Sequence, residues 1–253
     1  MARWSPADTP LLDELAHVEA TTGSIRHMVI DEAQDLSPMQ ARALGRRCAG
    51  GSLTILGDIA QSTAPGAVAS WQSLRHHLGS PDARLEVLGH GYRVPAEILD
   101  YAARLLPAIA PDLTPPISIR RTRDALTVTK ADHSDLPAAI VRACREHLVG
   151  DGSVGIITAD HDIPALHHLL TAAGLNTGVV GDVEDETQPT QLTCVPASLA
   201  KGLEFDAVIL IEPSRIVDAE QRGLQRLYVC LTRAVSSLHV IHTDPLPHLL
   251  HPH

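Results

Sequence analysis

Two adjacent carboxylates follow a short apolar run near the start of the sequence. The run is residues 28–30, and Asp31 and Glu32 end it. At the carboxyl end of a buried strand, such an aspartate can hold Mg²⁺, and the glutamate beside it can orient and deprotonate a water molecule for attack on a phosphoryl group. The alternative is structural, because acidic side chains also stabilise the N-terminus of a helix.

A second polar stretch, "LGDIAQS" at residues 56–62, follows the next apolar segment. Asp58 would support the metal's coordination shell, and the Gln61 amide would sense a phosphate. By itself, Gly-Asp after a strand is a common turn. Its place one strand beyond "DEAQD" predicts that both stretches line the same site, because neighbouring parallel strands end at the same edge of a sheet.

A third stretch, "GYRVPAEIL" at residues 91–99, places an aromatic ring directly before an arginine. The ring of Tyr92 suits a nucleotide base, and the guanidinium of Arg93 suits a phosphate, which it can bind through two parallel hydrogen bonds. The structural alternative is a tyrosine packed in the core with the arginine on the surface.

Two further stretches lie in the second half of the chain, "SLAKGLEFDAVIL" and "LYVCLTRAVSSLHV". In the first, Gly202 permits a tight turn, Glu204 can accept a hydrogen bond from a ribose hydroxyl, and Lys201 is one of only two lysines. In the second, Arg233 ends an expected helix just before a strand, from where it can reach a γ-phosphate.

Short apolar strands rich in β-branched residues recur between helical segments, which predicts an α/β fold with parallel sheets covered by helices. The expected strands are residues 25–30, 53–56, 84–88, 126–129, 154–158, 178–180, 191–195, 207–211 and 238–242. The expected helices are residues 7–20, 38–48, 68–78, 95–109, 136–148, 163–173 and 220–233. Ligands are expected at the carboxyl ends of the strands. The proline-rich stretch 107–116 is the expected domain boundary.

The composition is that of an ordinary globular protein, with 253 residues of which 44% are hydrophobic. The net charge of −10 argues against binding nucleic acid by bulk electrostatics, although a local basic groove stays open. No apolar stretch approaches the roughly 20 residues that span a bilayer, so a cytoplasmic protein without a membrane partner is expected. The four cysteines are predicted to be buried, reduced thiols, namely Cys48, Cys144, Cys194 and Cys230.

Taken in order, the five stretches resemble the motifs of superfamily 1 helicases of the UvrD/Rep type. "DEAQD" resembles the Walker B motif, and the others resemble the glutamine-bearing motif, the "NYR" motif, the "AKGLEF" motif and the "LYVALTRA" motif. "DEAQDLSPMQ" and the opening "RWSPADTPLLDEL" are similar to the HelD branch, the RNA polymerase-associated helicase-like ATPases. The resemblance implies a RecA-like, P-loop NTPase architecture with ATP bound between two RecA-like domains.

The resemblance also implies ATP and Mg²⁺ as cofactors and gives nucleotide-handling roles to ten positions. These are Asp31 as the Mg²⁺ ligand, Glu32 as the catalytic base, Gln61 as the link from the γ-phosphate to motion, Tyr92 at the adenine, Arg93 at the γ-phosphate, Glu204 at the ribose, Arg233 as an arginine finger, and Gln34, Lys201 and Gly202 as further nucleotide-binding residues. Two arginines at the transferred phosphate would stabilise the charge of the transition state.

One element of the family pattern is absent from these 253 residues. The Walker A loop holds the phosphates with its backbone N–H groups and its lysine, yet no Gly-Lys-Thr or Gly-Lys-Ser occurs. The only helix expected before "DEAQD" leaves no room for a phosphate-binding strand. We therefore expect the C-terminal portion of a longer protein whose remainder carries Walker A, with residues 1–112 as half of the first RecA-like domain and 113–253 as the second. The chain alone is predicted to be inactive.

The expected partner follows from a shortage of stacking residues. The family has an aromatic residue soon after the glutamine-bearing motif, whereas here residues 62–65 are Ser-Thr-Ala-Pro and Trp71 is the first candidate. Ser198 also stands where the family has histidine. With an acidic chain and few aromatics, remodelling of RNA polymerase fits better than strand separation on DNA. A non-enzymatic scaffold that binds RNA polymerase or another protein, and a DNA helicase proper, are the alternatives.

Overall fold

The computed structural model divides into two compact units, Met1–Val87 (unit 1) and Leu88–His253 (unit 2). It describes residues 5, 8–19, 25–48, 50–182 and 190–251. Part of the opening motif, including Trp4, lies outside the described residues, as do the two ends of the predicted opening helix.

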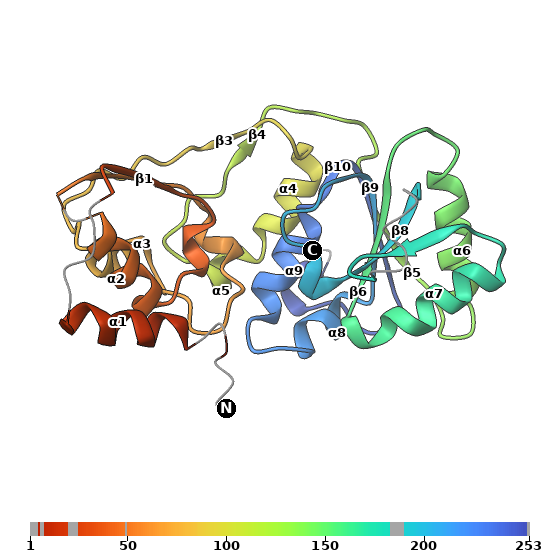
Figure 1. The fold of residues 1–253 in the computed structure, drawn as a ribbon. Coiled ribbons are helices and arrows are strands. Elements are labelled where there is room, and N and C mark those ends of the chain that lie inside the picture. The colour runs from red at the N-terminus through yellow and green to blue at the C-terminus, as the bar shows by residue number, and fades with distance from the viewer. Residues whose placement is uncertain (1–4, 6–7, 20–24, 49, 183–189, 252–253) are drawn as a thin grey trace. The chain divides into compact units, whose positions relative to one another are not determined.

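Unit 1 is built around a two-stranded parallel sheet (Figure 1). The strands are β1 (His27–Ile30) and β2 (Ser52–Ile55), which pair in register from His27–Ser52 to Ile30–Ile55. The helices are α1 (Thr9–Glu19), α2 (Pro38–Arg47) and α3 (Trp71–His77), and the 3₁₀ turns are η1 (Ala33–Asp35) and η2 (Ile59–Gln61). Side chains alternate along each strand, so Ile30 and Ile55 pack into the unit's core with Leu74 of α3.

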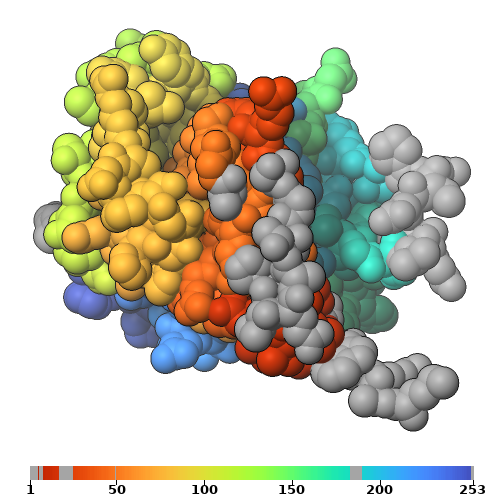
Figure 2. Space-filling model, turned by 60° about the vertical axis from the view of Figure 1, so that its left-hand side comes forward, coloured from red at the N-terminus to blue at the C-terminus, as the bar shows by residue number. Residues whose placement is uncertain are grey.

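Local sequence signals fix the helices of unit 1. Ser37 caps α2 through a hydrogen bond from the Gln40 backbone N–H, and the Gln40 side chain returns a bond to the Ser37 N–H. Helix α1 is tied to α2 by ion pairs, among them the one that Asp13 makes with Arg46 at 2.9 Å. Figure 2 draws unit 1 in red through orange and yellow.

Unit 2 holds a six-stranded, fully parallel sheet in the order β5-β10-β9-β6-β8-β7. Its strands are β5 (Leu126–Lys130), β6 (Val154–Thr158), β7 (Thr177–Val179), β8 (Leu192–Pro196), β9 (Phe205–Ile211) and β10 (Ala234–His242). A separate short pair joins β3 (His90–Gly91) to β4 (Ile117–Ser118). The crossovers between parallel strands are mostly helical, as parallel pairing requires.

Helices cover both faces of this sheet (Figure 1). They are α4 (Ala96–Ala103), α5 (Leu106–Ile109), α6 (Leu136–His147), α7 (Ile163–Ala172), α8 (Pro213–Asp218) and α9 (Gly223–Leu231), with 3₁₀ turns η3 (Asp160–Asp162), η4 (Ala197–Leu199) and η5 (His248–Leu250). Ile140 of α6 and Leu170 of α7 pack with Ile156 and Ile209 of the central strands. The predicted α/β class with parallel, helix-covered sheets is confirmed.

Two expected elements differ in the structure. Residues 84–88 form no strand, and Leu85, Val87 and Leu88 are 49%, 65% and 86% exposed, so this apolar stretch has no neighbouring strand to pair with. The helix expected over residues 95–109 is split into α4 and α5. Pro107 lies in the first turn of α5, where its missing N–H costs nothing, but a continuous helix would have placed it in the interior.

The division of the chain also falls earlier than the expected boundary at residues 112 and 113. Helices α4 and α5 contact α9, and β3 pairs with β4, so residues 88–112 belong to the compact body of unit 2. The proline-rich stretch is therefore a connection inside unit 2. The identities of the two RecA-like domains stay a prediction.

The four cysteines are buried and free, which confirms the predicted reduced thiols. Cys144 and Cys230 are both buried, and burial raises the pKa of each thiol to about 12. Within the described part of the chain, no helix is long and apolar enough to cross a membrane.

Candidate functional site

Asp31 and Glu32 lie directly after β1 and are both exposed. Glu32 adopts a left-handed backbone conformation, with φ 51° and ψ 34°, which is uncommon for a residue with a side chain. Its backbone N–H donates to Asp31 Oδ1 at 2.8 Å. The sharp turn ends the strand and holds both carboxylates at the carboxyl edge of the sheet of unit 1.

Gln34 connects the two polar stretches of unit 1. Its side chain is fully buried, its Nε2 donates to Glu32 Oε2 at 2.6 Å, and its Oε1 accepts from the Asp58 backbone N–H at 3.1 Å. Gly57 makes this approach possible, because a Cβ at that position would lie 2.2 Å from Gln34 Oε1. Gln34 therefore positions Glu32 and, in this arrangement, does not itself face solvent.

Asp58 and Gln61 form a small hydrogen-bonded turn after β2. Asp58 Oδ1 accepts from the Ala60 N–H at 3.0 Å, and Asp58 Oδ2 accepts from Gln61 Nε2 at 3.0 Å. Asp35 ties the next residues to the same place, because its Oδ1 accepts from the Thr63 backbone N–H at 3.0 Å. "DEAQD" and "GDIAQS" are thus adjacent, as the spacing of the two strands predicts.

The carboxylates of unit 1 suit Mg²⁺ bound mainly through water and phosphate. Mg²⁺ commonly takes only one or two protein carboxylates and keeps several waters. Asp31 is exposed and engages only Oδ1 in a hydrogen bond among the described residues, which leaves Oδ2 for such a role. Over that same part of the chain, no group of three or more His, Cys, Asp or Glu side chains is arranged to hold a metal by itself.

Tyr92 and Arg93 follow β3 in unit 2, and both are exposed. The Tyr92 side chain is 72% exposed, which rules out the alternative of a tyrosine packed in the core. Arg93 forms an ion pair with Glu204, 111 residues further along the chain. The structure therefore brings the predicted phosphate-binding arginine and the predicted ribose-binding glutamate together within unit 2.

The turn before β9 positions Glu204. Gly202 has φ 82°, in the left-handed region that glycine adopts readily, and the Leu203 N–H donates to the Ala200 carbonyl at 3.2 Å. Lys201 is half-buried in the same turn. The nearby Ser198 N–H donates to Asp160 Oδ1 at 3.0 Å, so that serine holds the end of β8 to the turn after β6.

Arg233 is only 4% exposed. Its Nε donates to the Val229 carbonyl at 3.0 Å and one terminal nitrogen donates to the Leu203 carbonyl at 3.3 Å. The guanidinium therefore joins the last turn of α9 to the turn that carries Glu204. In this arrangement it does not project into solvent, and its role as an arginine finger stays a prediction.

The predicted residues of unit 2 lie at an unexpected edge of its sheet. Glu204 precedes β9 and Arg233 precedes β10, so both stand at the amino ends of parallel strands. The predicted site residues Asp31 and Glu32 therefore lie at the carboxyl end of a strand in unit 1, whereas these two lie at the amino ends of strands in unit 2. The order of residues along each strand decides this, since a motif before a strand must lie at its amino end.

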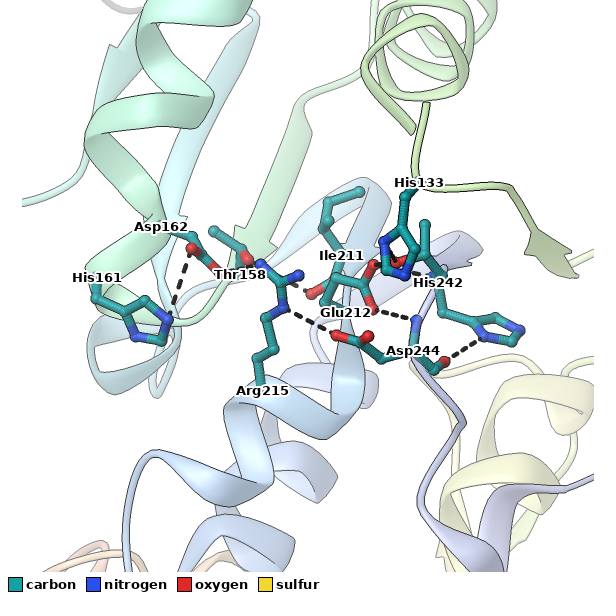
Figure 3. A network of polar contacts seen from close by, with 10 residues as sticks. His133, Thr158, His161, Asp162, Ile211, Glu212, Arg215, His242 and Asp244 are labelled. Atoms are coloured by element: carbon teal, nitrogen blue, oxygen red, sulfur yellow. Dashed lines mark hydrogen bonds and ion pairs between the residues drawn. The ribbon is translucent and has the colours of Figure 1, made fainter. Parts of the chain in front are cut away.

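The carboxyl edge of the same sheet carries a network that the motifs do not mark (Figure 3). Glu212, 1% exposed and with φ 48°, accepts hydrogen bonds from the Thr243 N–H at 2.9 Å and the Asp244 N–H at 3.2 Å. Arg215 donates to Asp244 at 3.1 Å and to Asp162 at 3.4 Å. The network ties together the segments that follow β6, β9 and β10. The carboxylates of Glu212, Asp244 and Asp162 all accept hydrogen bonds within it.

Arg120 is the residue near the motifs that the sequence analysis missed. One terminal nitrogen donates to the Arg93 carbonyl at 3.2 Å and to the Val235 carbonyl at 2.7 Å, and the other donates to Ser236 Oγ at 3.2 Å. The only signal in the sequence is the cluster "RRTR" at residues 120–123 in an acidic chain. That cluster does not by itself say which arginine is structural.

No protein-family model and no curated protein matches the sequence. Among solved structures, the chain is similar to the C-terminal domain of a possible DNA helicase from Lactobacillus plantarum WCFS1, with 24% identity and a TM-score of 0.49 over 63% of this chain and 92% of that chain. It is also similar to the helicase nonstructural protein 10 of an arterivirus, solved in complex with DNA, with 18% identity and a TM-score of 0.46. That match covers 90% of this chain but only 42% of the viral protein.

Proposed function

We propose that the chain is the C-terminal portion of an ATP-dependent superfamily 1 helicase or translocase-like motor. The observation that carries the proposal is the Arg93–Glu204 pair. Arg93 and Glu204 come from separate motifs, and each stands at a position that contacts the nucleotide in the proteins whose motifs they resemble. Their side chains meet within one folded unit. This pairing supports a common nucleotide-binding site, because neither motif by itself requires the two side chains to meet.

In unit 1, Glu32 is the proposed catalytic base. Gln34 holds the Glu32 carboxylate through Nε2 and so fixes the orientation of the proposed base. Mg²⁺, when bound beside Asp31, would neutralise charge on the phosphates. Gln61 is held by Asp58 and is the proposed sensor of the γ-phosphate.

In unit 2, the exposed ring of Tyr92 is the proposed platform for the adenine. Arg93 is the proposed γ-phosphate contact and Glu204 the proposed ribose contact, with Lys201 and Gly202 shaping the turn before Glu204. Arg233 would become an arginine finger only if its bonds to the Val229 and Leu203 carbonyls were exchanged for a phosphate.

The proposal includes a phosphate-binding loop that this sequence does not contain, supplied by the remainder of a parent chain. ATP hydrolysis should therefore be measured for the 253-residue chain and for a version extended upstream in the native gene. We expect no Mg²⁺-dependent turnover from the chain alone and clear turnover from the extended protein. Glu32→Gln in the extended protein should reduce turnover by about 10²- to 10⁴-fold, the usual contribution of a general base.

Turnover by the 253-residue chain alone would refute its predicted inactivity. An extended protein that contains Walker A and still fails to hydrolyse ATP, with and without nucleic acid or RNA polymerase, would refute the motor itself. Exposed Asp218→Asn is a suitable control, because it removes one carboxylate from the surface of unit 2 and lies outside the five motif stretches.

The proposed task of the motor is to remodel a complex of RNA polymerase or nucleic acid. The net charge of −10 and the position of Trp71, which packs against the core of unit 1, support a protein partner over processive movement along DNA. Titration with single-stranded DNA at low and moderate salt tests this. Tight binding with a steep salt dependence would favour DNA as the direct substrate.

The burial of Arg233 favours one alternative function. An arginine bonded to backbone carbonyls stabilises the fold, as a residue of a non-enzymatic scaffold would. Under this alternative the chain binds RNA polymerase or another protein without hydrolysing ATP. Full cellular function of the parent protein carrying Glu32→Gln would support the scaffold and contradict the motor.

A further inference from the structure

The ion pair between Arg93 and Glu204 is exposed on both sides. The Arg93 side chain is 43% exposed and that of Glu204 is 46% exposed. An ion pair in such a position is weak, because water and salt screen it. Another anion in solution can therefore compete with the Glu204 carboxylate for the guanidinium.

The backbone at Arg93 is held in place by hydrogen bonds to a neighbouring segment. Arg120 bonds to the Arg93 carbonyl and, through the same nitrogen, to the Val235 carbonyl at the start of β10. The Ala96 N–H donates to the Arg120 carbonyl at 2.9 Å, so the two segments are held together from both directions. The side chain of Arg93 can change its partner while its backbone stays in place.

We propose that the Arg93–Glu204 pair is an exchangeable latch, in which a polyphosphate displaces the Glu204 carboxylate from the Arg93 guanidinium. Arg120 is the positioning residue that holds Arg93 during the exchange. The inference rests on the proposed function, since it concerns the same two side chains. It adds the order in which these side chains engage a ligand. Phosphate must reach Arg93 before Glu204 becomes available to another donor.

The latch discriminates between classes of ligand. A guanidinium binds carboxylate and phosphate with the same planar set of donors, so a polyphosphate satisfies Arg93 after Glu204 leaves. Inorganic polyphosphate then leaves the Glu204 carboxylate unpaired beside an anion. A nucleoside triphosphate also offers ribose hydroxyls, which can donate to that carboxylate. The latch therefore favours nucleotides over inorganic polyphosphate.

Calorimetric titration of the full 253-residue chain with tripolyphosphate and with ATP, at fixed ionic strength, tests the latch. Glu204→Gln should bind tripolyphosphate about two- to five-fold more tightly than the unmodified chain, because the competing carboxylate is gone. Arg93→Gln should lose this binding. Arg121→Gln should not change it, since Arg121 is exposed and makes no hydrogen bond or ion pair within the described residues. Asp218→Asn controls for the removal of one negative charge.

A Glu204→Gln variant that binds tripolyphosphate no more tightly than the unmodified chain or than Asp218→Asn would overturn the latch. So would undetectable tripolyphosphate binding by both the unmodified chain and the variant.

A different result is expected if the proposed nucleotide-binding function is wrong. Tripolyphosphate would then bind Glu204→Gln more tightly as expected, so the exchange at Arg93 would stand. ATP would show no preference over tripolyphosphate in the unmodified chain, which would overturn the nucleotide site together with the preference for nucleotides derived from it. Arg120→Gln should weaken the tripolyphosphate binding of the Glu204→Gln chain, and an unchanged affinity would remove Arg120 from the proposal.

Discussion

Gln34→Met removes the side-chain bridge between the two polar stretches of unit 1 while keeping a side chain of similar length. In the native chain, Gln34 donates to Glu32 Oε2 at 2.6 Å and accepts from the Asp58 N–H at 3.1 Å, and no part of it is exposed. Methionine can make neither bond. The Asp58 N–H then loses its partner, and Glu32 loses the group that orients it.

The expected loss of stability follows from these two bonds. A hydrogen bond to a charged group contributes about 1.5–3 kcal/mol, and a neutral one about 0.5–1.5 kcal/mol. The apolar surface of methionine buried at the same site returns roughly 1 kcal/mol. We therefore expect Gln34→Met to lower the free energy of unfolding of unit 1 by about 1–3.5 kcal/mol.

Tryptophan fluorescence during urea denaturation measures this loss selectively. Of the two tryptophans of the chain, Trp71 packs against the core of unit 1, so its fluorescence follows the unfolding of that unit. The denaturation midpoint should fall, with little change in the slope of the transition. Circular dichroism, to which unit 2 contributes most of the helices and strands, provides a second probe for the same samples.

Gln72→Met is the matched control, because Gln72 is an exposed glutamine on α3 and the same replacement there should change stability by less than about 0.5 kcal/mol. Gln34→Glu provides a second arm. It places a carboxylate beside that of Glu32, so this variant should be less stable at pH 7 than at pH 5, where one of the two is more readily protonated. Equal midpoints for Gln34→Met, Gln72→Met and the native chain would refute the bridge.

Two further predictions concern unit 2. Gly223→Ala should destabilise unit 2 by about 1–3 kcal/mol or more in thermal denaturation, because the new Cβ would lie 2.0 Å from the Val217 carbonyl oxygen. Gly150→Ala is the control, because a Cβ at that position would point into open space. Equal melting temperatures for the two variants would contradict this packing. Burial lowers the pKa of His147 and of His239 below the usual 6.5, so the unfolded chain binds protons that the folded chain does not, and stability should fall as the pH drops below about 6.5. His239→Gln should flatten that pH dependence between pH 5 and 6.5, and an unchanged slope would exclude His239 as a source of it.

Most elements of the fold could be predicted because their signals are local. The cap at Ser37 with proline at the next position sets the start of α2, and the continuous apolar run of β6 marks a strand buried on both faces. The failure at residues 84–88 has the same origin. That stretch has the composition of a strand, but a strand also needs a neighbour to accept its backbone hydrogen bonds, and sequence composition does not supply one.

The sequence proposed the residues of the candidate site but could not give the contacts that these residues make. The sequence left Tyr92 open between a ligand-binding ring and a core residue, and its 72% exposure excludes the core, while its role at the adenine stays a prediction. Gln34 was grouped with nucleotide-binding residues, yet its full burial makes it the support of Glu32. Such outcomes depend on how densely neighbouring segments pack around a side chain, which the spacing of motifs does not encode.

The sequence by itself determined most of the strands and helices of the two units, the parallel α/β class and the lack of a Gly-Lys-Thr/Ser loop in these 253 residues. These are properties of short segments, where the period of apolar residues and the chemistry of single side chains decide the result. Only the tertiary structure decided that Arg93 pairs with Glu204, that Arg120 holds the backbone of Arg93, and that Arg233 is buried against carbonyl groups. Each of these contacts joins segments whose separation in space is set by packing, so no local pattern could have specified it.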